Sequence, residues 1–473
     1  MRRTLSAAGL VAVLVAVAAL WAMPSQAAEQ ARFDEVDAYL DAYAEQNDIP
    51  GMAAAVIGPK GVEHEYMQGD DGDGREVTAD TQFLIGSVAK TMTATIIMRL
   101  EATGELALDD HVSDHLDFPH EGDPTIEQLL THTAGFTGAD GIAAADRYDN
   151  EPGAIRRAVE SLEHSGTVGE YEYTSADFLV LGAIVESVTG RPYADVLESR
   201  LLEPLGMDHS AASVQASDDL PPGHRLWWGR SVGYDPPFDE SGAPYASVVS
   251  TLTDFETYAT AQLRGDSIDP EIRQQMQRPW VESSNDHYGL GWSVAKHDGQ
   301  RIVHHTGATP GYFVHLWLVP EAQSAVVILT NVYSEARAPS LASGAEDVWR
   351  ILDGQTREPA GGDPLLSAMP WVLTALAACG LALAVLSVWR PIRRTRRWVA
   401  AVGALIVAGA LWMLPGYVGY DWRALRIWAP DSAWSLIAAL VLWALAGIGW
   451  LFPRFVRGAE GGTRTLTPEG TGT

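Results

Sequence analysis

Three uncharged apolar runs near the C-terminus constrain this 473-residue chain more than any other feature. They span 371–389, 398–414 and 433–452, and each has about the length that a helix needs to cross a bilayer. Buried core helices are the alternative, but a soluble core seldom needs three charge-free helices so close together. Tryptophans lie near the run ends, as an interfacial aromatic belt requires: Trp371, Trp389, Trp398, Trp412, Trp434 and Trp450. The sequence therefore predicts three transmembrane helices.

The loop between the first two runs sets the expected topology. Residues 390–397 hold five arginines and no acidic residue, and such loops stay in the cytoplasm. The first run then passes inward, the second outward and the third inward, which places the tail 453–473 in the cytoplasm. No ionisable residue lies within a run, so nothing in the runs favours a transporter subunit. We expect these helices to be a membrane anchor, or a partner-binding surface that the sequence does not define.

The N-terminus has the pattern of an export signal. Two arginines precede an apolar stretch, and small residues follow it at Ser25 and Ala27. This pattern predicts a signal peptide over residues 1–27 that is cleaved after Ala27, with an uncleaved anchor as the alternative. The arginine pair also bears a weak similarity to a twin-arginine signal. In either case we expect residues 29–365 to lie outside the cytoplasm, at the cell membrane.

The net charge of −29 excludes a nucleic-acid binder. The acidic excess lies in residues 29–365, which hold 57 of the 61 acidic side chains but 20 of the 32 basic ones. Only Lys60, Lys90 and Lys296 are lysines, so a lysine in a chemically suggestive position stands out. The single cysteine, Cys379, excludes an intrachain disulfide and a Cys/His zinc site of the usual kind.

Hydrophobic periodicity near the start of the exported part predicts a first helix and a first strand. Apolar residues recur at helical spacing over 33–43, and a short apolar run follows at 51–58. Helical patterns then dominate over roughly 85–265. We expect this middle part to be a helical insertion.

Strand-length runs return near the other end of the exported part. They lie at 288–296, 301–305, 312–319 and 324–331, and turn residues separate them. These runs predict an antiparallel meander, closed by a helix around 341–352. The sequence thus predicts an α+β domain over 29–357, with an antiparallel sheet built from both chain ends and flanked by helices. A linker is expected at 358–370.

One turn of a predicted helix separates Ser87 from Lys90. On a helix the two side chains share a face, so the lysine amine can reach the serine hydroxyl. A serine becomes a nucleophile when a base removes its proton. A lysine can be that base when burial or nearby positive charge keeps it partly neutral. By itself the pattern is weak, because a helix-capping serine followed by a surface lysine gives the same spacing.

Two further motifs follow in order. Tyr173-Thr174-Ser175 comes just before a predicted helix, and His305-Thr306-Gly307 lies on a predicted strand. With these motifs the chain resembles the serine hydrolases related to class C β-lactamases and penicillin-binding proteins, a family that includes D-alanyl-D-alanine carboxypeptidases, esterases and D-aminopeptidases. The resemblance covers about 33–353. Supporting stretches are 81–90, 106–116, 126–136, 171–182, 201–207, 250–254, 288–292 and 305–312.

The resemblance implies the fold of β-lactamases and transpeptidases and an acyl-enzyme mechanism. It implies that Ser87 attacks a carbonyl and that Lys90 and Tyr173 relay protons, after which water hydrolyses the acyl-enzyme. Five further residues are implied to line the substrate site: Ser175, His305, Thr306, Gly307 and Ala308. The backbone N–H groups of Ser87 and Ala308 would hold the oxyanion. Gly307, which has no side chain, would let the backbone and a ligand approach each other closely.

Two positions depart from the family pattern. Ser175 stands where asparagine is usual, and its shorter side chain replaces only some of the amide's hydrogen bonds. This change weakens the expectation of β-lactam turnover more than that of ester or peptide hydrolysis. His305 stands where β-lactamases have lysine, and an imidazole binds a substrate carboxylate well only when protonated. Strand alternation puts His304 on the opposite face, so we assign it, like His132, a structural role.

Neither of two stretches with metal-binding residue types predicts a metal site. The histidines and aspartates of 110–115 have helical spacing, yet the same stretch matches a segment of the resembled family, so a solvated acidic turn is the better interpretation. Residues 70–74 resemble a calcium loop, but Arg75 and a missing glutamate break the EF-hand pattern. We expect no metal and no cofactor.

Two functions of different class fit these patterns. The first is an exported, membrane-anchored serine hydrolase that acts on an ester or amide, with a small-molecule or peptide substrate such as a cell-wall D-amino-acid peptide. The second is a catalytically idle site that binds a ligand and signals through the membrane helices. The presence of Ser87, Lys90 and Tyr173 together favours the enzyme, and Ser175 is the main feature that favours the alternative.

Overall fold

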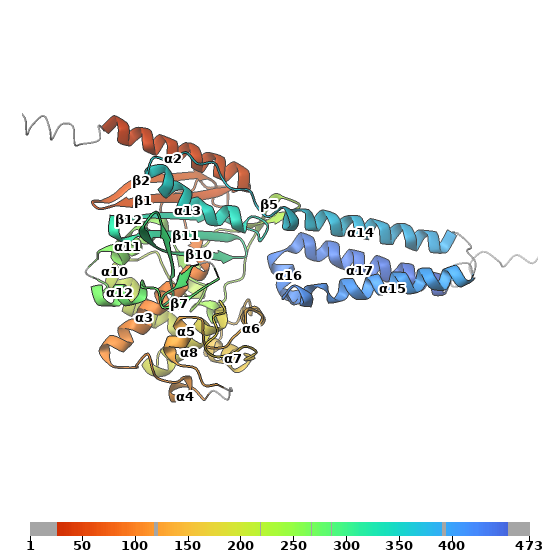
Figure 1. Cartoon of the computed structure of the whole chain (residues 1–473), viewed down its shortest axis with the longest axis horizontal. Helices are drawn as coiled ribbons and strands as arrows, with labels where there is room; N and C mark the ends of the chain where they lie inside the picture. Colours follow the sequence, from red (N-terminus) through yellow and green to blue (C-terminus); the bar gives the residue numbers. More distant parts are fainter. Residues whose placement is uncertain are drawn as a thin grey trace, which may run out of the picture. The chain divides into compact units, whose positions relative to one another are not determined.

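The chain is described by a computed structural model, which covers residues 26–117, 122–217, 219–265, 267–284, 286–389 and 394–452. Most of the predicted signal peptide, the first half of the arginine-rich loop and the tail 453–473 lie outside the described residues. The chain divides into two compact units (Figure 1). The first comprises most of the chain up to Gly362, and the second comprises residues from Asp363 onward together with 226–230 and 334–336.

An eight-stranded antiparallel sheet is the centre of the first unit. Its order is β2-β1-β12-β11-β10-β9-β8-β7, so strands from the two chain ends pair where β1 meets β12. The strands are β1 (Gly51–Gly58), β2 (Gly61–Gly69), β7 (Val281–Glu282), β8 (His287–Tyr288), β9 (Ser293–His297), β10 (Gln300–Thr309), β11 (Tyr312–Val319) and β12 (Ser324–Thr330). The predicted α+β class and the meander are confirmed. Strand β2 is an addition that the sequence analysis did not predict.

Helices cover both faces of this sheet. On one face α13 (Ala338–Leu352) packs on β11 and β12 and beside α2 (Gln26–Asn47) (Figure 1). These two helices approach closely at Gly344, where an added β-carbon would lie 2.9 Å from the Tyr43 ring. The Tyr43 hydroxyl donates to the Leu341 carbonyl at 2.9 Å. On the other face α11 (Leu252–Leu263) packs on β1 and β12.

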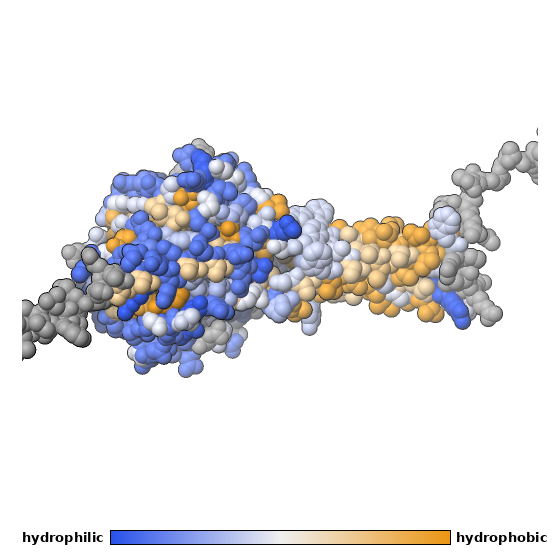
Figure 2. Space-filling model, turned by 90° about the horizontal axis from the view of Figure 1, so that it is seen from above, coloured by the Kyte–Doolittle hydropathy of each residue, from blue (hydrophilic) through white to orange (hydrophobic). Residues whose placement is uncertain are grey.

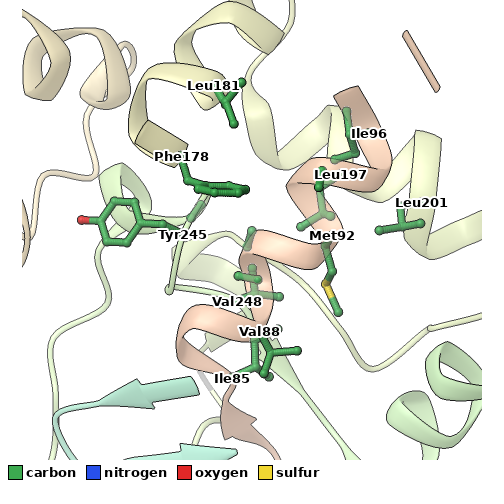
Figure 3. Close-up of a cluster of buried hydrophobic side chains, with 14 of the residues drawn as sticks. Ile85, Val88, Met92, Ile96, Phe178, Leu181, Leu197, Leu201, Tyr245 and Val248 are labelled. Atoms are coloured by element: carbon green, nitrogen blue, oxygen red, sulfur yellow. The ribbon is translucent and has the colours of Figure 1, made fainter. Parts of the chain in front are cut away.

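The helical insertion is organised around α3 (Ala89–Thr103) and α8 (Ser175–Thr189), which pack against each other. Almost every residue of α3 up to Leu100 is buried. Figure 3 shows side chains of α3 and α8 in one apolar cluster with residues from other segments. The labelled members are Ile85, Val88, Met92, Ile96, Phe178, Leu181, Leu197, Leu201, Tyr245 and Val248. Because interiors are close-packed, this cluster fixes the start of α3 relative to the start of α8.

Shorter elements lie mostly in the first unit. The helices are α4 (Val112–His115), α5 (Ile126–Leu130), α6 (Gly138–Ala144), α7 (Ala154–Glu160), α9 (Tyr193–Leu197), α10 (Glu203–Leu205) and α12 (Pro270–Met276). Two small sheets pair β3 (Phe83–Leu84) with β6 (Val249–Ser250), and β13 (Val332–Tyr333) with β4 (Gly223–Trp227) and β5 (Arg230–Tyr234).

The second unit is a bundle of three long helices and one short one. Its helices are α14 (Pro364–Trp389), α15 (Arg394–Tyr417), α16 (Trp422–Trp428) and α17 (Pro430–Leu451). The three long helices are apolar and long enough to cross a membrane, and Figure 2 shows their hydrophobic surface. A shared apolar core holds them together, formed by Leu373, Ala377, Leu411, Leu436 and Ala439.

The first of these helices begins at Pro364, within the segment 358–370 that is predicted to be a linker. Asp363 Oδ1 accepts hydrogen bonds from the backbone N–H groups of Leu365 (2.7 Å) and Leu366 (2.9 Å). Pro364 takes the first helical position, where a missing N–H group costs nothing. Asp363 and Pro364 together are a start signal of a kind that the sequence itself displays.

Candidate active site

Ser87 lies where strand β10 passes the start of α3. It belongs to a single 3₁₀ turn, η1 (Gly86–Val88), that leads directly into α3. A β-carbon at Gly307 of β10 would lie 1.9 Å from the Ile85 carbonyl oxygen and 3.0 Å from the Ser87 backbone nitrogen. One at Gly86, whose φ is +53°, would lie 2.4 Å from the Ala308 nitrogen. Glycine at both positions therefore allows the backbone nitrogens of Ser87 and Ala308 to come close together.

Lys90 sits one turn further along, fully buried beside Ser87. Its Nζ lies 2.9 Å from Ser87 Oγ, 3.3 Å from Ser175 Oγ and 3.3 Å from the Tyr245 carbonyl oxygen. Burial lowers the pKa of Lys90 to about 7, and only an ionised Asp177 would act against this effect. A neutral amine has two N–H donors and one lone pair. It can donate to Ser175 and Tyr245 and still accept the proton of Ser87.

Tyr173 covers the amine from the other side. Its ring centroid is 5.1 Å from Lys90 Nζ, and 40% of the residue is exposed, so it forms part of the wall that a substrate meets. Burial around the hydroxyl raises the pKa of Tyr173 beyond its ordinary value, and the nearby Ser87 hydroxyl offsets part of this rise. Tyr173 is therefore a neutral hydroxyl that can pass a proton on, rather than a phenolate base.

Ser175 is the first residue of α8, and the preceding Thr174 caps that helix by accepting from the Ala176 N–H at 3.2 Å. The cap directs the start of α8 toward Lys90. Ser175 Oγ then reaches the Lys90 amine as described above. The structure thus places all three residues Ser87, Lys90 and Ser175 in one hydrogen-bonded group, as their motifs predict.

His305 lies in the same site, but its imidazole ring is neutral and cannot act as a cation that binds a substrate carboxylate. Its Nδ1 lies 2.7 Å from the carbonyl oxygen of Thr306, so Nδ1–H donates, and its Nε2 lies 3.2 Å from the Tyr288 hydroxyl, from which it accepts. Burial, together with the charge of Lys90, lowers the pKa of His305 to about 3. The ring is therefore neutral between pH 6 and 8 and gives a substrate carboxylate no positive charge.

The neighbours of His305 follow strand alternation. Gly307 shares its face and meets η1, whereas Thr306 pairs with His315 of β11 and presents its side chain on the opposite face. Thr306 can therefore serve a substrate through its backbone alone. His304 also lies on the opposite face, with its ring 5.1 Å from that of Trp317, as its assignment to a structural role requires.

His132 is hydrogen-bonded, as predicted for a structural histidine, but its partner and neighbours tie it to the site. Its Nδ1 lies 2.6 Å from Asp177 Oδ2. Its ring centroid is 4.5 Å from that of Tyr173 and 4.8 Å from that of Tyr288. Sequence reasoning missed Asp177, Tyr245 and the role of Tyr288. Asp177 and Tyr288 both lie in stretches that carry the family resemblance, 171–182 and 288–292, whereas Tyr245 lies in none of them.

The two stretches weighed as metal sites form local hydrogen bonds. Arg75 Nε binds Asp71 at 2.6 Å, and the Asp73 N–H donates to the same carboxylate at 2.9 Å, so the guanidinium holds this loop. His115 pairs with Asp110 at 2.9 Å. Within the described ranges, no group of three or more His, Cys, Asp or Glu side chains has an arrangement that could hold a metal ion.

Comparisons with known proteins agree with this geometry. Residues 36–347 match the sequence model of the Beta-lactamase family. Penicillin-binding protein 4 of Amycolatopsis lactamdurans is 32% identical over 325 residues, which are 62% of this chain and 83% of that protein. An unguisins hydrolase of Aspergillus campestris is 27% identical over 64% of this chain and 62% of its own length. The octameric penicillin-binding protein homologue from Pyrococcus abyssi shares the fold, with a TM-score of 0.58 and 23% identity over 72% of this chain and 81% of that one.

Proposed function

The chain belongs to the beta-lactamase family, and from that membership we propose that it is an exported, membrane-anchored serine hydrolase that cleaves an ester or amide through an acyl-enzyme on Ser87. One observation carries the proposal. The buried Lys90 amine lies 2.9 Å from the Ser87 hydroxyl. Ser175 Oγ and the Tyr245 carbonyl oxygen are acceptors for the two N–H groups of the neutral amine. Three apolar helices of membrane-spanning length support the anchor.

Acylation would begin at Ser87. Neutral Lys90 accepts the Oγ–H proton while Oγ bonds to the substrate's carbonyl carbon, whose oxygen becomes an oxyanion. The backbone N–H groups of Ser87 and Ala308 are the donors for that oxyanion, because close packing at Gly307 brings the two segments together. The bond to the leaving group then breaks, and the departing oxygen or nitrogen takes the proton from Lys90 through the Tyr173 hydroxyl.

Deacylation would reuse the same groups. A water molecule attacks the acyl carbon and gives its proton to the Lys90 and Tyr173 pair. The bond from carbon to Ser87 Oγ breaks, Oγ regains a proton, and the acid product leaves. No other residue needs to change its charge, because burial already holds Tyr173 and His305 neutral.

The substrate class follows from what the site offers. His305 is neutral and both its nitrogens are engaged, so the site gives a substrate carboxylate no cation there. Ser175 contacts Lys90 but lacks the amide that would also bind a β-lactam side chain. We therefore place esters and amides that carry no carboxylate near the scissile bond ahead of β-lactams. The names of two relatives, a penicillin-binding protein and a hydrolase of unguisins, are compatible with this range.

A fluorophosphonate probe tests the proposal on the full-length protein in detergent. We expect covalent labelling of the wild type and of the matched control Ser284→Ala, at an exposed serine outside the three motifs, and no labelling of Ser87→Ala. Hydrolysis of p-nitrophenyl acetate, a D-Ala-D-Ala peptide and nitrocefin by the same three proteins would rank the substrates. Absence of labelling in the wild type, or equal labelling of Ser87→Ala, would leave the idle ligand-binding module as the better account.

A further inference from the structure

A buried carboxyl and imidazole lie directly behind the proposed catalytic residues. His132 follows α5 in a turn with φ of +58°, and Asp177 lies in the first turn of α8. His132 Nδ1 and Asp177 Oδ2 are 2.6 Å apart, and both residues are 1% exposed. A left-handed backbone costs a non-glycine residue energy, so the surrounding structure holds His132 in this place.

The His132 ring supports two of the residues that face the substrate. It packs tilted against Tyr173 at 4.5 Å and against Tyr288 at 4.8 Å between ring centroids. Tyr288 in turn donates its hydroxyl to His305. A shift of His132 would therefore move both tyrosines. It would displace the residues around Tyr173 on one side of the site and those around His305 on the other.

The contacts of this pair determine its charge. Among the described residues, His132 is the only basic side chain within ion-pair distance of Asp177. Asp177 Oδ1 and His132 Nε2 are buried without a hydrogen-bond partner in that part of the chain. The backbone N–H of Thr174 also points at His132 Nδ1, at 3.5 Å. A nitrogen approached by an N–H donor is an acceptor, so the hydrogen shared over 2.6 Å belongs to the carboxyl.

An ionised Asp177 would also work against the proposed base. An isolated buried carboxylate is costly, and its charge would stabilise the ammonium form of Lys90. That form has no lone pair to accept the proton of Ser87. A carboxylic acid at Asp177 avoids both effects while keeping the hydrogen bond to His132.

We propose that His132 and Asp177 are a neutral positioning pair for the acylation of Ser87, in which the Asp177 carboxylic acid donates its proton in a hydrogen bond to His132 Nδ1. The pair holds the ring that supports Tyr173 and Tyr288, and it keeps negative charge away from Lys90. The inference rests on the proposed function. Burial also favours the neutral forms of both residues, because it raises the pKa of Asp177 and lowers that of His132.

Several titratable groups from other elements act on this pair. They are Lys90 of α3, Tyr171, Glu172 and Tyr173 before α8, Tyr288 of β8 and His305 of β10. Lys90 favours the ionised carboxylate, whereas Glu172 favours the acid. The tyrosines and His305 are neutral near pH 7, so Lys90 is the one group whose titration reports on the charge of Asp177.

The pH dependence of kcat/KM in Asp177→Asn tests this charge. Asparagine keeps the shape and a donor toward His132 Nδ1 but can never be negative. We expect a loss of about threefold, from a weaker hydrogen bond, with the acid limb of the profile where it is in the wild type. A limb displaced to lower pH would overturn the proposal, because it would show that an ionised Asp177 had been raising the pKa of Lys90. Asp195→Asn, an exposed carboxylate, is the matched charge control.

The positioning role needs a second variant. His132→Ala removes the supporting ring, and we expect kcat to fall by ~10- to 100-fold with little change in KM. His132→Phe keeps a ring and should lose less. Equal kcat in the wild type and His132→Ala would contradict the role.

Nitrogen-15 NMR of histidine-labelled wild type tests the pair without any variant or any turnover. We expect a pyridine-type Nδ1 in His132, and a pyrrole-type Nδ1 bonded to hydrogen would overturn the neutral pair. Fluorophosphonate labelling of the same sample separates the two claims. An unlabelled protein refutes the proposed function, whereas a labelled protein with a pyrrole-type Nδ1 refutes only this inference.

Discussion

Two buried polar clusters lie on opposite faces of strand β10, and they differ in what burial does to them. The proposed catalytic cluster, Ser87, Lys90, Tyr173 and Ser175, has a hydrogen-bond acceptor for each Lys90 N–H group. The back-face cluster, His304, His315 and Trp317, packs ring against ring, with centroids 5.1 to 5.8 Å apart. Within the described residues, its buried ring nitrogens His304 Nδ1, His315 Nδ1 and Nε2, and Trp317 Nε1 have no hydrogen-bond partner.

Burial lowers pKa values in both clusters. Only in the first cluster does it give a group that can take up and release a proton near neutral pH. The pKa of Lys90 falls from 10.5 to about 7, so a large fraction of the amine is neutral and still strongly basic. The pKa of His304 falls from 6.5 to about 4, so this ring is neutral throughout the neutral range and changes charge only in acid. The same physical cause therefore produces a base on one face and a passive, acid-sensitive core on the other.

The largest expected effect is that of Lys90→Met, which removes the base and keeps a buried chain of similar length. We predict a loss of about 10³-fold in kcat/KM for p-nitrophenyl acetate, in the usual range for a general base. Lys296→Met, at an exposed lysine of β9, is the matched control and should keep full activity. If Lys90→Met were as active as Lys296→Met, Lys90 would not be the base, and the two clusters would not differ in function.

His304→Leu tests the back-face cluster through stability. The neutral ring has a folded pKa below its unfolded value, so the unfolded state binds the proton first and stability falls as pH drops below about 6.5. At pH 4 this costs up to about 3 kcal/mol. We expect urea unfolding of His304→Leu to lose that much less stability between pH 7 and pH 4, with kcat/KM at pH 7 unaltered. A loss of activity without a loss of stability would place His304 in the site after all.

Tyr173→Phe sharpens the roles inside the catalytic cluster. The ring that covers Lys90 remains, but the neutral hydroxyl that relays the proton is gone. We predict a fall of about 10²-fold in kcat with KM nearly unchanged. If KM rose and kcat stayed constant, Tyr173 would be a binding residue and the leaving group would receive its proton by another route.

The smallest effect is expected from Ser175→Asn. The longer amide restores a second donor and acceptor at the start of α8 beside Lys90. We predict a gain of up to about tenfold in nitrocefin turnover, which is the scale of one hydrogen bond, and less than half of that gain for ester hydrolysis. An equal gain on both substrates would show that position 175 acts on Lys90 rather than on the choice of substrate.

The sequence predicted those parts of this comparison that depend on local geometry. Helical spacing brought Ser87 and Lys90 together, and strand alternation separated His304 from His305. Both rules need only a few neighbouring residues. The α+β class followed for the same reason, because the strands at both chain ends have clear patterns.

The parts that depend on long-range packing could not be predicted. The Tyr245 carbonyl that accepts from Lys90 belongs to a loop 155 residues further along the chain, and any residue type could supply that atom. The partner of His132 is 45 residues away. The lowered pKa of His305 likewise depends on burial and on the nearby charge of Lys90, which a motif does not reveal.

The protonation of Lys90 is the central claim, and the scarcity of lysine makes it directly measurable. With lysine labelled with carbon-13 at Cε, the full-length protein in detergent gives signals from Lys60, Lys90 and Lys296 alone, and Lys60→Arg and Lys296→Arg assign them. We predict that the Lys90 signal titrates near pH 7. A Lys90 signal that titrates at about 10.4, the ordinary pKa of a lysine in water, would contradict the account.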